Sequence, residues 1–206
     1  MNKATVEYLK RDRRLDPSKT AILVVDAQMS EFNDEARAAK PDYVARIETV
    51  AVPTMQKLMS AARPLGIEVV YTVIESLTKN GRDRSLDHKM SDIHVPKGSP
   101  LAKMIPGIEP KEDDIVLPKT SSGVFNSTNA AYVLRNLGIE NLIVVGFLTD
   151  QCVDMTVRDG ADLGFYMVCV SDGCTTHTQE RHETALNAFG GYCRVQTAEE
   201  VIATFE

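Results

Sequence analysis

The sequence predicts a three-layer α/β/α fold of the Rossmann-like type, with a mostly parallel six-stranded sheet in the strand order 3-2-1-4-5-6. Two observations favour this class. Short, nearly continuous apolar runs rich in β-branched residues recur along the chain, as expected for strands that are buried on both faces. Segments with helical spacing of apolar residues lie between these runs, and such alternation is typical of βαβ units with right-handed crossovers.

Six segments are candidate strands, because each apolar run has the length of a strand rather than of a buried helix. The last of them is the weakest. They are Ala21–Val25, Ile67–Val73, Ile115–Leu117, Leu142–Val145, Tyr166–Val170 and Tyr192–Val195.

Five segments have helical periodicity or helix-boundary residues. Pro53 lies inside the first segment and is expected to divide or kink it. The second begins with residues of N-cap type and ends before Gly138, a typical C-cap. The five segments are Val44–Ala62, Asn126–Leu137, Val153–Leu163, Glu180–Phe189 and Ala198–Phe205.

The chain has 206 residues, which corresponds to a single domain spanning residues 1–206. One stretch, at about 75–110, interrupts the alternation of strands and helices. It is polar, contains several glycines and prolines, and shows no strong periodicity. Because long irregular insertions in compact domains usually carry function, we expect this insertion to form a lid, an oligomer contact or both.

Composition excludes several functional classes. Apolar residues make up 43% and charged residues 25% of the chain, which is typical of a globular protein. The net charge is −6 and no basic stripe is present, so nucleic acid is not an expected partner. No apolar run approaches the ~18 residues of a membrane span, and the polar start of the chain does not resemble a secretory signal. A cytoplasmic protein is therefore expected.

The cysteines Cys152, Cys169, Cys174 and Cys193 all lie in the last third of the chain. Their even number permits two disulfides, but in a reducing compartment free thiols are the commoner state. Cys169 and Cys193 fall within or beside predicted strands and are expected in the core. Cys174 follows a glycine in a predicted loop and is expected to be partly exposed.

Ligands of open parallel sheets bind beyond the carboxyl ends of the strands, so the residues after each apolar run are candidates for chemistry. Cys152 lies between the fourth strand and a helix. The partial positive charge of a helix N-terminus favours thiolate there, and free turn N–H groups can bind an oxyanion. Considered singly, each of the three candidates also has a non-catalytic interpretation. Cys152 could be a small buried side chain, Asp26 a structural cap and Lys119 an exposed surface charge.

Asp26, Lys119 and Cys152 have complementary chemistry when they are considered together. They follow the predicted carboxyl ends of three separate strands. A carboxylate can take the thiol proton as general base, and a lysine ammonium beside it keeps the carboxylate ionised. The thiolate then attacks a carbonyl carbon while turn amides hold the oxyanion. The set predicts an acyl-transfer hydrolase that needs no metal.

Three stretches resemble the isochorismatase-like cysteine hydrolases, in the family's order and spacing. They are TAILVVDAQMSEF, VLPKTSSGVFNST and LIVVGFLTDQCVDMTVRDGADLGFYMVCVSDGC. The resemblance implies Asp26 as general base, Lys119 as its partner and Cys152 as nucleophile. It also implies a non-proline cis peptide between Phe147 and Leu148, and an oxyanion hole formed by the backbone N–H groups of Leu148 and Cys152.

The presence of a thiol at Cys152 favours the amidase-type branch of that family, which includes nicotinamidases, N-carbamoylsarcosine amidohydrolase, ureidoacrylate amidohydrolase and biuret hydrolase. These enzymes release ammonia or an amine through a thioester. The nicotinamidase metal motif, an Asp-x-His pair and a later histidine, is absent, and His88 and His94 are interpreted as histidines of the insertion. No metal or cofactor is therefore expected. An isochorismatase-type vinyl-ether hydrolase and a non-catalytic binding protein on this fold are the alternatives.

The predicted substrate is a small amide or ureide, and six residues are candidates to bind it. Glu75 follows the second strand, where a carboxylate could accept hydrogen bonds from a ureido group, although a salt bridge to a nearby arginine is an equal alternative. Phe125 could pack over the substrate or form a helix-entry staple. The six are Gln28, Phe32, Glu75, Phe125, His177 and Gln179. The resemblance also implies a homo-oligomer, either a dimer or a tetramer.

Overall fold

The computed structural model describes residues 10–205 and contains a six-stranded sheet in the order β3-β2-β1-β4-β5-β6. Every neighbouring pair of these strands is parallel. The predicted fold class and strand order are therefore confirmed. The strands are β1 (Thr20–Val25), β2 (Glu68–Ile74), β3 (Ile115–Lys119), β4 (Asn141–Phe147), β5 (Tyr166–Thr175) and β6 (Arg194–Gln196).

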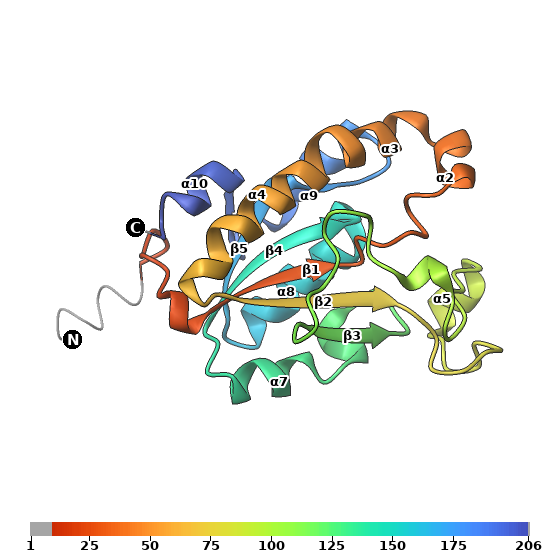
Figure 1. Cartoon of the computed structure of the whole chain (residues 1–206), viewed down its shortest axis with the longest axis horizontal. Coiled ribbons are helices and arrows are strands. Elements are labelled where there is room, and N and C mark those ends of the chain that lie inside the picture. The colour runs from red at the N-terminus through yellow and green to blue at the C-terminus, as the bar shows by residue number, and fades with distance from the viewer. Residues whose placement is uncertain (1–9, 206) are drawn as a thin grey trace.

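Helices cover both faces of the sheet, and the strand tips point toward α2 and α5 in Figure 1. One face is covered by α2 (Asp34–Ala39), α3 (Pro41–Arg46), η2 (Ile47–Ala51), α4 (Val52–Ala62) and α10 (Ala198–Ile202). The other is covered by α6 (Val124–Ser127), α7 (Ala130–Asn136), η5 (Thr149–Val153), α8 (Asp154–Asp162) and α9 (Gln179–Phe189). Short turns of 3₁₀ helix are η1 (Pro17–Lys19), η3 (Arg63–Leu65) and η4 (Pro100–Ala102), and the insertion contains α5 (Leu86–Met90).

Two hydrophobic clusters hold these layers together. β1 is buried along its whole length, because its alternate side chains enter different clusters. Ile22 and Val24 pack toward α4, while Ala21, Leu23 and Val25 pack toward α7 and α8. This explains why the central strands are apolar without alternation.

Pro53 does not break its helix. α3, η2 and α4 follow one another without a gap, and the backbone takes a wider π-helical path just before the proline. Val52 N–H donates to Ile47 O, five residues earlier. Pro53 is thus the second residue of α4, in a first turn, where its missing N–H is best tolerated.

The prediction of one helix over Asn126–Leu137 was wrong in its boundaries. The structure has α6 and α7 instead, separated at Thr128, whose backbone is extended. Thr128 Oγ1 accepts a hydrogen bond from Ala130 N–H at 3.0 Å. Thr128 therefore closes a short turn between the two helices, and Asn129 is the N-cap residue of α7.

β5 extends beyond its predicted end at Val170 to Thr175. Its register against β4 shifts between Val144 and Gly146, so a bulge absorbs the extra residues. Cys174 consequently lies in a strand and is buried, contrary to the prediction of a partly exposed loop cysteine. Cys169 and Cys193 are buried as predicted.

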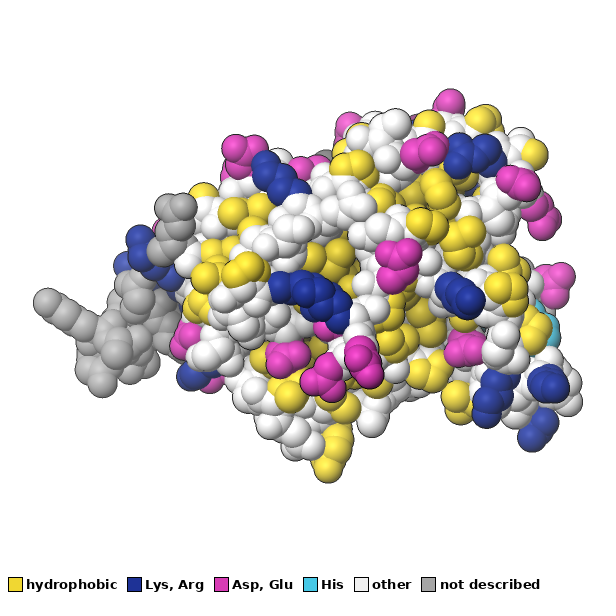
Figure 2. Space-filling view, viewed as in Figure 1, with side chains coloured by type: hydrophobic (Ala, Val, Ile, Leu, Met, Phe, Trp, Pro, Cys, Tyr) yellow, Lys and Arg dark blue, Asp and Glu magenta, His cyan; other side chains and the backbone are white. Residues whose placement is uncertain are grey.

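On the face shown in Figure 2, acidic and basic side chains are interspersed among apolar patches. No helix among the described residues is long and apolar enough to cross a membrane.

Candidate active site

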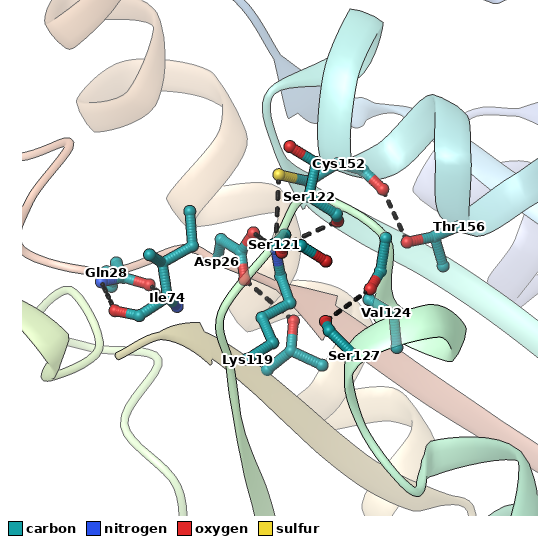
Figure 3. A network of polar contacts seen from close by, with 12 residues as sticks. Asp26, Gln28, Ile74, Lys119, Ser121, Ser122, Val124, Ser127, Cys152 and Thr156 are labelled. Atoms are coloured by element: carbon teal, nitrogen blue, oxygen red, sulfur yellow. Dashed lines mark hydrogen bonds and ion pairs between the residues drawn. The ribbon is translucent and has the colours of Figure 1, made fainter. Parts of the chain in front are cut away.

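Asp26, Lys119 and Cys152 converge in one buried cluster (Figure 3). Asp26 directly follows β1, Lys119 is the last residue of β3, and Cys152 lies in η5. Lys119 Nζ lies 2.8 Å from Asp26 Oδ2 and 3.5 Å from Cys152 Sγ. The carboxyl ends of the strands thus bring the three predicted groups within contact distance of one another.

Asp26 is held in a fixed orientation by its neighbour Thr72 on β2. The Asp26 backbone has φ 52°, a left-handed conformation that aspartate tolerates better than most residues and that turns the chain out of β1. Its N–H donates to Thr72 O at 3.1 Å, and Thr72 Oγ1 donates to Asp26 Oδ1 at 3.0 Å. Oδ2 contacts Lys119 but accepts no well-directed hydrogen bond from any described residue. That oxygen is ion-paired with Lys119 but retains a lone pair that can accept a proton.

Lys119 is fully buried, and its ammonium group is surrounded by acceptors. Nζ donates to Ser121 O at 2.7 Å and to Ser122 O at 3.0 Å, in addition to its contacts with Asp26 and Cys152. Burial alone would lower the pKa of Lys119, but the charges of Asp26 and Cys152 raise it above its usual value. The side chain therefore stays positively charged inside the protein.

The sequence predicted that the helix N-terminus would favour a thiolate at Cys152, but the packed cluster shifts the pKa of this thiol in the opposite direction. Burial, followed by the charge of Asp26, raises the pKa of Cys152 to about 12 against the opposing effect of Lys119. The helix also begins earlier than predicted, at Thr149, so Cys152 lies inside its first turn. The thiol is protonated at neutral pH and requires a base when it reacts.

The segment between β4 and η5 shapes the wall beside Cys152. The Phe147–Leu148 peptide bond is cis, as the resemblance implied. Gly146 has φ 125°, and a Cβ there would lie 2.0 Å from Val25 O, so only glycine lets β4 pass β1 at this point. Among the hydrogen bonds of residues 10–205, none is donated by the N–H of Leu148.

A cavity of about 790 Å³ borders the cluster. Asp26, Cys152 and Leu148 line it, together with side chains from the insertion and from the segments that follow β1 and β5. Two acidic residues of its wall are neutralised by arginines, Asp150 by Arg181 and Asp154 by Arg158.

Two of the six predicted substrate-binding residues, Gln28 and His177, line the cavity. The protein itself satisfies the side-chain amide of Gln28. Nε2 donates to Ile74 O at 3.0 Å and to Leu101 O at 3.1 Å, and Oε1 accepts from Ile74 N–H at 2.6 Å. Gln28 therefore ties the end of β1 to β2 and the insertion, and its predicted contact with substrate stays a prediction.

His177 lines the cavity, and its Nε2 is 2.8 Å from Lys40 Nζ. Burial, and then the charges of Lys40 and Arg181, lower the pKa of His177. The imidazole is therefore neutral at pH 7 and accepts a hydrogen bond from the lysine. His177 remains a candidate for contact with substrate.

Glu75 and Phe32 do not line the cavity. Glu75 Oε1 accepts a hydrogen bond from Gly98 N–H at 2.7 Å, so the carboxylate braces the insertion instead of facing a substrate. Phe32 packs against the core cluster on the α4 side, with the guanidinium of Arg37 over its ring. The loops that follow β1 and β2 therefore direct Phe32 and Glu75 away from the cavity, and the predicted substrate contacts of these two residues are corrected.

Phe125 and Gln179 also lie outside the cavity. Phe125, in α6, stacks on Phe165 with ring centroids 5.7 Å apart and belongs to the core on the α8 side. Gln179 begins α9, donates to Glu183 Oε1 at 3.0 Å and lines a separate cavity of about 360 Å³. The extra length of β5 carries Gln179 away from Cys152.

The cavity is also lined by residues that the sequence did not indicate as site residues, among them Glu31, Lys40 and His88. His88 is 1% exposed and belongs to α5, which Ser85 caps by accepting a hydrogen bond from His88 N–H. Burial, and then the charge of Lys119, lower the pKa of His88, so it is neutral. The only sequence signal for this helix is the serine cap, and nothing in the insertion indicates that its histidine faces the strand ends.

No group of three or more His, Cys, Asp or Glu side chains within residues 10–205 is arranged to hold a metal ion. Nδ1 of His88 and Nε2 of His94 are both buried without a hydrogen-bond partner among these residues.

Comparisons with known proteins agree with this geometry. The isochorismatase domain family model matches residues 20–200. A ureidoacrylate amidohydrolase from Acinetobacter baylyi is 30% identical over 183 residues, covering 78% of this chain and 72% of the relative.

Two solved structures share the fold. A cysteine hydrolase from Pseudomonas syringae has a TM-score of 0.83 at 23% identity, covering 93% of this chain and 94% of the other. An N-carbamoylsarcosine amidase from Thermoplasma acidophilum has a TM-score of 0.71 at 24% identity, covering 88% and 97%.

Proposed function

We propose that this chain, which belongs to the isochorismatase family, is an amidohydrolase that cleaves a C–N bond of a small amide or ureide through a thioester on Cys152. The observation that carries the proposal is the buried contact of Lys119 Nζ with Asp26 Oδ2 and Cys152 Sγ. The amidohydrolase activity named for the Acinetobacter relative supports it.

Acylation begins with a protonated thiol, because the pKa of Cys152 is raised to about 12. Asp26 takes the Sγ–H proton on Oδ2, the oxygen that is ion-paired with Lys119, while Sγ bonds to the substrate's carbonyl carbon. Lys119 compensates the negative charge that moves between carboxylate and sulfur. A base positioned in this way typically contributes about 10²–10⁴-fold to the rate.

The oxyanion that forms in this step needs donors on the far side of the carbonyl. We assign that role to the backbone N–H groups of Leu148 and Cys152, because both residues line the cavity. When the carbonyl re-forms, the C–N bond breaks and Asp26 returns its proton to the leaving nitrogen. Ammonia or an amine departs, and a thioester remains.

Water completes the cycle. Asp26 accepts a proton from the water that attacks the thioester carbon, and the C–S bond then breaks as the proton passes to Sγ. The product is a carboxylic or carbamic acid, and the free thiol is restored. No redox or cofactor step enters this scheme.

Ammonia release across a substrate panel tests the proposal. The panel contains nicotinamide, N-carbamoyl amino acids, ureidoacrylate and biuret, with isochorismate followed by a separate readout. We expect turnover of at least one ureide and its loss in Cys152→Ala. Cys193→Ala, which removes a buried thiol outside the cavity, is the matched control. Cleavage of isochorismate alone, or ammonia release that survives Cys152→Ala, would refute the assignment.

We also propose that the protein is a cytoplasmic homo-oligomer in which the insertion contributes to the subunit contact. All four cysteines are free thiols, which fits a reducing compartment. Leu86 and Met90 of α5 are 72% and 77% exposed, and such apolar side chains favour burial against a partner. Analytical ultracentrifugation of wild type and Leu86→Glu tests this, with a monomeric wild type as the contrary result.

A further inference from the structure

Glu31 brings a second carboxylate into the cavity that the proposed reaction does not use. It lies in the turn between β1 and α2 and is partly buried. Tyr43, on α3, donates its hydroxyl hydrogen to Glu31 Oε2 at 3.1 Å. The Tyr43 side chain is 1% exposed, and its ring lies edge-on to both Phe147 and His177. The tyrosine thus fixes one oxygen of Glu31 from inside the protein.

The other oxygen of Glu31 has no partner. Among residues 10–205, Oε1 makes no hydrogen bond, and Glu31 forms no salt bridge. This distinguishes it from Asp150 and Asp154, which arginines neutralise. Lys40 also lines the cavity, but its Nζ is directed to His177. A partly buried carboxylate with an unused acceptor is costly unless a ligand or water supplies a donor.

Glu31 and Tyr43 lie close enough to the reacting groups to be affected by their charges. Burial raises the pKa of Glu31, and the charge of Asp26 adds to this effect, while Lys40 opposes it. Burial and Glu31 raise the pKa of Tyr43, and Cys152 contributes in the same direction. Glu31 and Cys152 also line the same cavity, so the carboxylate borders the space in which a substrate bonded to Cys152 would lie.

We infer that Glu31, held by Tyr43, accepts a hydrogen bond from an N–H of the substrate and so selects amides and ureides that retain that hydrogen. The inference rests on the proposed function, which it deepens by naming the substrate class. Glu31 is a specificity-determining residue, whereas Tyr43 positions it. Fully N-alkylated amides lack the donor, and the free oxygen would remain unsatisfied beside them.

Alkylation of Cys152 tests this inference without any natural substrate. Iodoacetamide carries amide N–H groups, and N,N-dimethyl-2-iodoacetamide does not. The second-order rate of Cys152 labelling by each reagent is measured at pH 9 by mass spectrometry in wild type and in Glu31→Gln. In the variant, the amide oxygen of the glutamine accepts the hydrogen bond from the Tyr43 hydroxyl. The NH₂ group of the glutamine then faces the N–H of the reagent, and two donors cannot form a hydrogen bond with each other. We expect the rate ratio of iodoacetamide to its dimethyl analogue to fall about 10-fold.

Two further variants separate recognition from folding. Tyr43→Phe frees Glu31 to rotate and is expected to lower the same ratio by a smaller factor. Glu35→Gln, an exposed carboxylate of α2 outside the cavity, is the matched control and should leave the ratio unchanged. A general loss of packing or of thiol reactivity would slow both reagents equally, so the ratio would not move.

A ratio in Glu31→Gln within two-fold of wild type would overturn the inference. Its failure is distinguishable from failure of the proposed function, because alkylation requires no turnover. Absence of ammonia release from every panel compound would refute amide hydrolysis even with the ratio altered. A panel-active wild type with an unchanged ratio would refute only the role of Glu31.

Discussion

Replacing Lys119 by methionine should destabilise the protein severely, because Lys119 is the only cation in contact with Asp26 among the described residues. Both side chains are almost completely buried, at 0% and 4% exposure. Removing one partner of a buried ion pair typically costs about 3–5 kcal/mol, since the remaining charge keeps its desolvation penalty. The carbonyls of Ser121 and Ser122 would also lose their donor. This is a large share of the roughly 5–15 kcal/mol that stabilises a typical domain.

Urea unfolding at pH 7 measures the effect, with Asp26→Asn and the double variant Asp26→Asn/Lys119→Met completing the cycle. The double variant leaves no uncompensated charge, so it should be more stable than Lys119→Met by about 2 kcal/mol or more. All three variants should lack activity, because each loses a group of the reacting cluster. Their differences in unfolding free energy therefore test the buried ion pair and not the catalytic role of either residue. A Lys119→Met protein within about 1 kcal/mol of wild type, or additive costs in the cycle, would refute the reasoning about the buried pair.

Three other properties follow from the same structure. Because the pKa of Cys152 is raised to about 12, its alkylation rate should keep rising above pH 10, whereas a thiol near the ordinary value of 9.0 would level off. Gln28→Ala should lower the free energy of unfolding by about 2–4 kcal/mol in urea titrations, because it removes three hydrogen bonds. Glu75→Gln should leave the KM of the enzyme within about two-fold of wild type, because this side chain contacts the insertion and lies outside the cavity. Burial lowers the pKa of His88, His177 and His182 in the folded state, so the unfolded chain binds more protons below about pH 6.5. Stability should therefore fall from pH 7 to pH 5, and an unfolding free energy that is flat over this range would contradict that account.

The positions of Asp26 and Lys119 at the ends of β1 and β3 could be predicted from the sequence. Asp26 and Lys119 directly follow or end apolar runs, and parallel strands bring such positions to one edge of the sheet. Predicting the position of Cys152 required the additional assumption that a turn leads from β4 into a helix. The turn and the helix are present, but the helix begins at Thr149, earlier than predicted. The ionisation of Cys152 could not be predicted, because the burial and the charge of Asp26 that raise its pKa depend on the packed cluster.

Candidates one or more turns beyond the strand ends were less predictable. Phe125 is a short distance from Lys119 in sequence, yet α6 directs its ring toward Phe165 and the core. Gln179 was expected near Cys152 because β5 was predicted to end at Val170. The polar residues Ser171 and Asp172 resemble a loop, and the register shift that keeps them in the strand has no clear sequence signature.

The two carboxylates Glu75 and Glu31 show where this limit lies. A cavity carboxylate that accepts N–H groups was expected at Glu75 from its place after β2, but Glu75 lies outside the cavity and its Oε1 accepts from Gly98 N–H of the insertion. Glu31 occupies the cavity instead, because Tyr43 from α3 fixes it there. The reacting cluster is thus set by strand geometry, while the wall that contacts the rest of the substrate is set by side-chain pairing between loops and helices. Substitutions in that wall should change which amide is accepted while Asp26, Lys119 and Cys152 keep their contacts, and the selective loss expected in Glu31→Gln is the simplest case.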